Sequence, residues 1–183
     1  MKFTLVYRGD LPPNGSAKEK WRIRRELEPQ LRRLWTIAPF SDIAKYLDPA
    51  YEPNNCYVGK VLGEFEFMPL ISTKLDLQAN LEIRPMSSSM PGGLLHSGDI
   101  DNRLKTLFDA LSIPTNQQIP DGAEVDADKR VFCLCEDDRL ITDVRVTNNR
   151  LLSVDDKSRQ TLVVIDVRPV AFRVTFANIG ISV

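Results

Sequence analysis

Apolar side chains recur at helical spacing in a stretch that follows Ser16. The spacing predicts an α-helix over residues 17–35 that begins after a capping Ser16, since serine is a favoured residue at helix N-termini. Pro29 lies inside this range and predicts a kink or a restart, because proline lacks the backbone N–H. The apolar face consists of Ile23, Leu27, Leu31 and Leu34.

A second helical stretch is the most regular in the chain. Its apolar stripe predicts a helix from residue 100 that ends before Pro114. A polar line lies one residue round from this stripe, formed by Asp101, Lys105 and Asp109 at intervals of four. The stripe consists of Ile100, Leu104, Leu107, Phe108 and Leu111.

Alternation of apolar and polar residues predicts the strands. They are expected at residues 3–8, 57–62, 64–70, 74–84, 131–134, 140–147, 161–167 and 171–176, with a short helix at 39–47. The three strands between 57 and 84 should form an antiparallel meander. Because no repeat or composition break divides the chain, we expect one α+β domain over residues 1–183, with a mixed, largely antiparallel sheet packed against two main helices.

Charge limits the ways in which this chain can bind a polyanion. Its 183 residues carry 24 Lys plus Arg against 25 Asp plus Glu, a net charge of -1, so nucleic acid would have to meet a local patch or bound metal ions. The cations of the first helix are either a solvated face or a phosphate-contacting patch, and position alone leaves both open. They are Lys18, Lys20, Arg22, Arg25, Arg32 and Arg33.

Several classes of site lack support in the sequence. Cys133 and Cys135 would lie on one face of a strand and are best explained as buried structural thiols. His96 is the single histidine, which excludes a mechanism that needs a histidine pair. No glycine-rich phosphate loop is present, so no nucleotide cofactor is expected. The lack of a signal peptide or of an apolar run long enough for a bilayer predicts a cytoplasmic protein without membrane contact.

Two carboxylates mark the start of the second helix. Asp99 and Asp101 can simply stabilise the positive end of the helix, with Lys105 as the ion-pair partner of Asp101 one turn later. Alternatively, two carboxylates joined by a third from a strand edge make an oxygen-rich site for a hard divalent cation. Two such ions can activate a water and stabilise the leaving oxygen in phosphodiester cleavage.

The residues around these carboxylates resemble a known family. The string Asp99-Ile100-Asp101-Asn102-Arg103-Leu104-Lys105, its continuation Phe108-Asp109-Ala110-Leu111 and the later pair Asp137-Asp138 are similar to the core signature of the RusA-type Holliday junction resolvases. The resemblance implies that Asp99, Asp101 and Asp138 bind Mg²⁺ or Mn²⁺ and that Lys105 assists catalysis. It implies supporting or structural roles for Asn102 and Asp109.

The resemblance also implies an activity and an assembly. We expect a homodimeric, metal-dependent endonuclease that cleaves branched DNA in recombination or repair. The stretch from Pro114 to Cys135 is longer than the family pattern, and its acidic residues (Asp121, Glu124, Asp126 and Asp128) would repel DNA or belong to a partner surface. The alternatives are a catalytically inactive RusA-like protein that binds nucleic acid or regulates, and a nuclease for other branched DNA.

Overall fold

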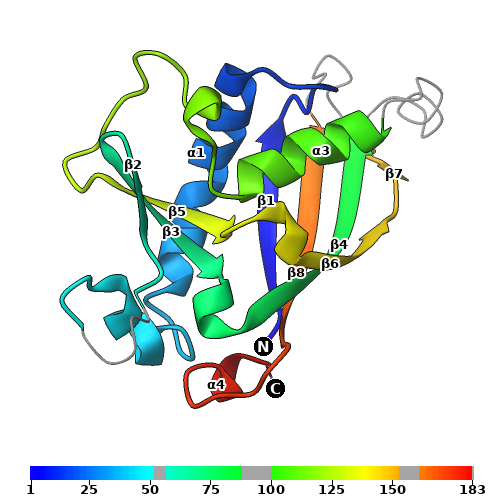
Figure 1. The fold of residues 1–183 in the computed structure, drawn as a ribbon. Helices are drawn as coiled ribbons and strands as arrows, with labels where there is room; N and C mark the ends of the chain where they lie inside the picture. Colours follow the sequence, from blue (N-terminus) through cyan, green and yellow to red (C-terminus); the bar gives the residue numbers. More distant parts are fainter. Residues whose placement is uncertain (52–56, 88–99, 153–160, 183) are drawn as a thin grey trace.

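Two β-sheets and two long helices make up the fold (Figure 1), which a computed structural model describes for residues 1–51, 57–87, 100–152 and 161–182. The larger sheet contains β1 (Phe3–Gly9), β8 (Thr161–Ala171), β4 (Leu77–Ser87), β6 (Ile141–Val146) and the short β7 (Asn149–Arg150). The smaller contains β2 (Lys60–Leu62), β3 (Phe65–Ile71) and β5 (Arg130–Cys135). The helices are α1 (Ala17–Leu34), α3 (Ile100–Leu111) and α4 (Ile179–Ser182), with 3₁₀ turns η1 (Ser41–Leu47), η2 (Thr73–Leu75), η3 (Asn116–Gln118) and η4 (Asp138–Leu140).

Both sheets are mixed. In the larger, β8 pairs antiparallel with β1 and β4, whereas β4 pairs parallel with β6 and β7. In the smaller, β2 and β3 are antiparallel and β3 and β5 are parallel. The predicted α+β class with two main helices is therefore confirmed, although the strands form two sheets instead of one.

The predicted meander is wrong at its last step. β3 and β4 belong to different sheets because η2 turns the chain between them. Ser72 accepts a hydrogen bond from the Lys74 backbone N–H at the start of η2, and Asp76 ends it in the left-handed conformation at φ 53°. The loop-forming chemistry of these two polar residues prevents a simple hairpin.

Helix α1 runs through Pro29 without a break. Ser16 and Glu19 form a reciprocal capping box at its start, which confirms the predicted cap. Pro29 is exposed, so its ring faces solvent and displaces no core side chain. The expected restart at Pro29 is absent because the buried leucines on both sides hold one continuous face against the core.

A single apolar cluster joins the two sheets and both long helices. It includes Leu27 of α1, Leu70 of β3, Ile83 of β4 and Leu107 of α3, all at most 1% exposed. A smaller cluster around Trp21 packs α1 on the smaller sheet. Cys133 lies in this smaller cluster.

The two strand cysteines are buried free thiols, as expected. Burial raises the pKa of Cys133 to about 12, while Cys135 lies in the main cluster. Cys56 lies outside the described residues. None of the described helices has the length and apolar character needed to cross a membrane.

The C-terminal part differs from the prediction. β8 continues through Pro169 to Ala171, and residues 172–176 form bends and a turn instead of a strand. The pairing of β8 with β1 ends at Val167. At Pro169, β8 pairs with β4 alone among the described strands. The missing N–H of Pro169 therefore costs no hydrogen bond on the side where β1 has ended.

Candidate functional site: an acidic groove beside α3

Helix α3 presents the predicted polar line to one side of the molecule. Asp101 and Lys105 are exposed and Asp109 is half-buried. Asp109 follows Asp101 by eight positions, a rise of about 12 Å along the helix. Asp99 and His96 lie outside the described residues.

The second acidic pair forms the turn η4, which follows β5 and contacts α3 (Figure 1). Asp137 caps the turn by accepting a hydrogen bond from the backbone N–H of Arg139 at 3.0 Å. The guanidinium of Arg139 donates to the same carboxylate at 2.8 Å and 3.0 Å. These hydrogen bonds lower the pKa of Asp137 to about 2.

A groove of about 390 Å³ opens where the C-terminal end of α3 meets η4. Its walls combine carboxylates with amide and hydroxyl groups from α3, η3 and η4. The polar lining residues are Lys60, Asp109, Ser112, Thr115, Asn116, Gln118, Glu136, Asp137 and Asp138. The Oγ of Ser112, a residue that is 5% exposed, has no hydrogen-bond partner among the described residues.

Three of the four groove carboxylates are held by fixed partners. Asp109 accepts from Lys20 of α1 at 2.7 Å, and Asp137 is held by Arg139. Glu136 Oε2 accepts from the side chain of Ser72 and from the backbone and side chain of Thr73, at 2.8–2.9 Å.

Asp138 differs from these three because its hydrogen bonds stay within its own turn, to the Asp137 side chain and the Arg139 backbone. It forms no ion pair within the described chain, and it is exposed. Partial burial of its carboxyl, then the negative charge of Asp137 and a side-chain hydrogen bond with it, and then the charge of Asp109 raise the pKa of Asp138. An incoming cation would therefore offset the negative charges that surround Asp138.

The structure brings Asp138 near Asp109, two turns beyond Asp101 on α3. Asp101 and Lys105 do not line the groove. In the part of the chain that is described, no group of three or more Asp, Glu, His or Cys side chains is arranged to hold a metal ion. Because Asp99 lies outside that part, the set of Asp99, Asp101 and Asp138 stays a prediction.

Helix α1 fixes the end of α3 that borders the groove. Arg24, which is 1% exposed, donates through Nη2 to the backbone oxygens of Asp109 at 2.6 Å and Ser112 at 3.0 Å. Its positive charge thus lies at the negative end of α3. The sequence indicates Lys20 only as one cation of a basic helix and does not single out Arg24, so their contacts with α3 were not predicted. The one available signal for Asp109 was its spacing of four from Lys105.

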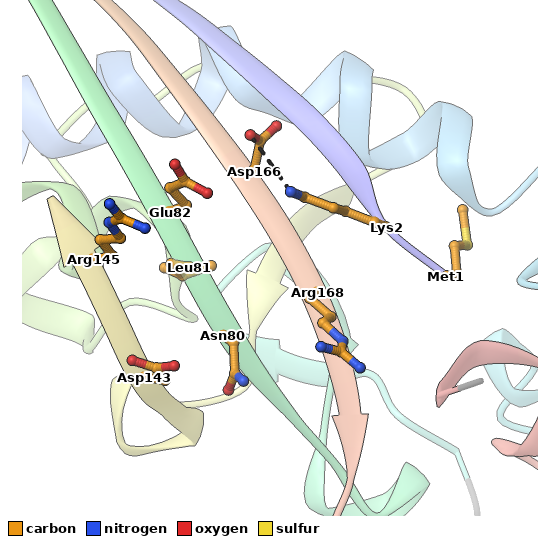
Figure 2. Close-up of a pocket in the computed structure, with 9 residues that line it drawn as sticks. All are labelled: Met1, Lys2, Asn80, Leu81, Glu82, Asp143, Arg145, Asp166 and Arg168. Carbon is orange, nitrogen blue, oxygen red and sulfur yellow. Dashed lines mark ion pairs between the residues drawn. The ribbon is translucent and has the colours of Figure 1, made fainter. Parts of the chain in front are cut away.

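A larger hollow of about 580 Å³ lies on the outer face of the larger sheet, with α1 behind that sheet (Figure 2). Here acids and bases alternate. Asp166 accepts from Arg84 at 2.7 Å and lies 3.8 Å from Lys2. The charged lining residues are Lys2, Glu82, Asp143, Arg145, Asp166 and Arg168. Since the charges balance, this hollow lacks the excess of carboxylates that a hard cation needs.

No family model, no curated protein and no solved structure matches this chain.

Proposed function

We propose that the protein is a metal-dependent endonuclease that hydrolyses phosphodiester bonds in branched DNA, with Holliday junctions as its substrate. The observation that carries this proposal is Asp138, a carboxylate without an ion pair in a groove rich in acids, beside the helix that bears Asp101 and Lys105. Magnesium ions bind through a few carboxylates and retain several waters, so Asp138 would serve as one ligand and the other ligands would come from outside the groove.

The chain's own residues have distinct roles in this proposal. Asp99, Asp101 and Asp138 would hold Mg²⁺ or Mn²⁺, and the ion would supply Lewis-acid chemistry for activating a water and stabilising a leaving oxygen. Lys105 is exposed on α3 one turn after Asp101 and orients the scissile phosphate. Arg24 and Lys20 keep the end of α3 in place, which holds Asp109 beside the groove.

A homodimer belongs to the same proposal. A four-way junction has two-fold symmetry, and two copies of the chain related by a two-fold axis would make paired, symmetric cuts. Sedimentation of the purified protein tests this assembly. A monomer at the concentrations that support cleavage would contradict it.

The deciding experiment is cleavage of a labelled synthetic four-way junction with and without Mg²⁺. We expect symmetric nicks that require the metal and disappear in Asp101→Asn and Asp138→Asn, with folding preserved. Asp143→Asn is the matched control, because Asp143 is an exposed acid of β6 outside the groove.

Other outcomes identify the alternatives. Junction binding without cleavage favours a catalytically inactive binding or regulatory protein, which agrees with the absence of a three-acid metal group among the described residues. Cleavage of flaps instead of junctions favours a nuclease for other branched DNA. Full activity in Asp101→Asn contradicts the assigned site.

A further inference from the structure

Five cations occupy the solvent side of α1. The helix has 18 residues, so it is about 27 Å long. At 100° per residue the five fall within one stripe, which we call the α1 stripe: Lys18, Arg22, Arg25, Arg32 and Arg33. In a protein of net charge -1, this stripe is a local concentration of positive charge.

An acidic segment covers part of the α1 stripe. The acidic strap, residues 121–128, connects η3 to β5 and packs Ala123 and Val125 against the cluster around Trp21. Asp126 pairs with Arg25, and Asp128 pairs with Arg32 at 2.5 Å. The carboxylates of the strap thus neutralise two cations of the stripe.

The remaining cations of the stripe form no salt bridge with a carboxylate in the described part of the chain. Lys18 and Arg33 are exposed, and neither forms an ion pair with any described residue. Arg22 donates to the hydroxyl of Tyr7 and to the backbone oxygen of Asp10. Lys18 and Arg33 stand about 22 Å apart along the axis, the length of roughly six base pairs at 3.4 Å each.

We propose that the α1 stripe binds the phosphate backbone of a nucleic-acid duplex and that Asp126 and Asp128 occupy phosphate positions on Arg25 and Arg32. This inference rests on the proposed function, which identifies the polyanion as DNA. The stripe would bind one duplex arm of the substrate at a place separate from the cleavage groove. The side chains of Asp126 and Asp128 are 49% and 53% exposed. Surface pairs of this kind contribute about 0–1 kcal/mol each, so a polyanion can displace them.

Arg32 is prepared for this exchange. Its Nε donates to Glu28 at 2.7 Å, its Nη2 donates to the backbone oxygen of Arg130 at 2.8 Å, and its guanidinium lies 4.7 Å from the ring centre of Phe132. Three contacts therefore hold the guanidinium at the surface when Asp128 leaves.

The test measures binding of an unbranched 20-base-pair duplex in EDTA over a series of salt concentrations. Each phosphate contact contributes about 0.9 to the slope of log K against log salt. We expect Lys18→Gln/Arg33→Gln to flatten the slope by about 1.8 and Asp126→Asn/Asp128→Asn to steepen it by up to about 1.8. Asp121→Asn/Glu124→Gln is the matched control, because it makes the same charge change in the strap at exposed acids without ion pairs in the described chain.

Two results would overturn the inference. One is a salt slope in Lys18→Gln/Arg33→Gln that equals the wild-type slope. The other is a salt slope in Asp126→Asn/Asp128→Asn that equals the slope of the control Asp121→Asn/Glu124→Gln. If the strap pairs are purely structural, Asp126→Asn/Asp128→Asn lowers the melting temperature and leaves the slope unchanged. EDTA removes the metal, so this binding test is independent of the cleavage test. Unchanged salt slopes would contradict the role of the α1 stripe without contradicting the proposed nuclease. Absence of junction cleavage would contradict the nuclease without contradicting the role of the stripe.

Discussion

At the scale of single residues, Asp138 illustrates a conflict between stability and activity. Partial burial and the charges of Asp137 and Asp109 disfavour its ionised form, so the folded state is less stable with Asp138 charged. Asp138→Asn should raise the melting temperature at pH 7 by about 1 °C, because screening at an exposed group leaves a few tenths of a kcal/mol. The same variant should lose metal-dependent cleavage. A fall in melting temperature, measured by calorimetry beside Asp143→Asn, would contradict this explanation.

Asp166 behaves in the opposite way. A hydrogen bond from Thr4 at 2.5 Å, together with Arg84 and Lys2, lowers the pKa of this buried carboxyl. Its contribution is therefore present above the unfolded-state pKa, near 4, and is lost as the pH falls through the lower folded-state pKa. Asp166→Asn should cost about 1–3 kcal/mol at pH 7 and progressively less below about pH 4.

Urea unfolding of Asp166→Asn at several pH values measures this effect. The control is Asp143→Asn, an exposed acid without an ion pair in the described chain, which should change stability by less than about 0.5 kcal/mol. A penalty for Asp166→Asn that stays constant from pH 7 down to pH 2 would show that packing, not charge, makes Asp166 important.

At the scale of elements, α1 contains a removable defect. Pro29 lacks an N–H for the backbone oxygen of Arg25, and its ring crowds that oxygen. Because Pro29 is exposed, Pro29→Ala loses no core contact, and we expect stability to rise by about 1–3 kcal/mol. Glu26→Ala, an exposed change in the same helix, should stay within about 0.5 kcal/mol of the wild type. Destabilisation by Pro29→Ala in urea titration would show that α1 needs the proline to curve around the core.

Local signals explain which elements the sequence predicts well. The Ser16 cap and the strict alternation along β4 depend on neighbours in the chain, and both appear in the structure. Pairing partners depend on distant residues. The parallel pairing of β3 with β5, and the placement of β4 in the other sheet, follow from a 3₁₀ corner that no periodicity reveals.

The candidate site shows the same division. The spacing of Asp101, Lys105 and Asp109 predicts one polar line on α3, and the structure contains that line. The ion pair between Lys20 and Asp109 joins residues that are far apart in the chain, so the sequence alone does not predict it. The acidic strap was expected to repel DNA or to meet a partner, yet Asp126 and Asp128 pair with arginines of α1.

At the scale of the whole molecule, the shared core makes the two sheets one unfolding unit. Met68 of β3 and Leu134 of β5 lie in the same buried cluster as Leu5 of β1 and Val163 of β8. Loss of either sheet would expose the apolar face of the other, which is unfavourable. We therefore expect one cooperative unfolding transition for the described fold.

The two tryptophans allow a direct test, because they report on different clusters. Trp21 packs against Phe65 of the smaller sheet at 5.0 Å between ring centres, and Trp35 packs against Phe40 in the main core at 5.6 Å. In Trp35→Phe the fluorescence reports the smaller cluster, and in Trp21→Phe it reports the main core. Each signal should have the same urea midpoint as far-UV circular dichroism of the same variant. A lower midpoint for fluorescence than for circular dichroism in Trp35→Phe would mean that the smaller sheet opens first. Since that sheet carries the acidic strap and supports η4 through β5, such opening would loosen the groove before the rest of the protein unfolds.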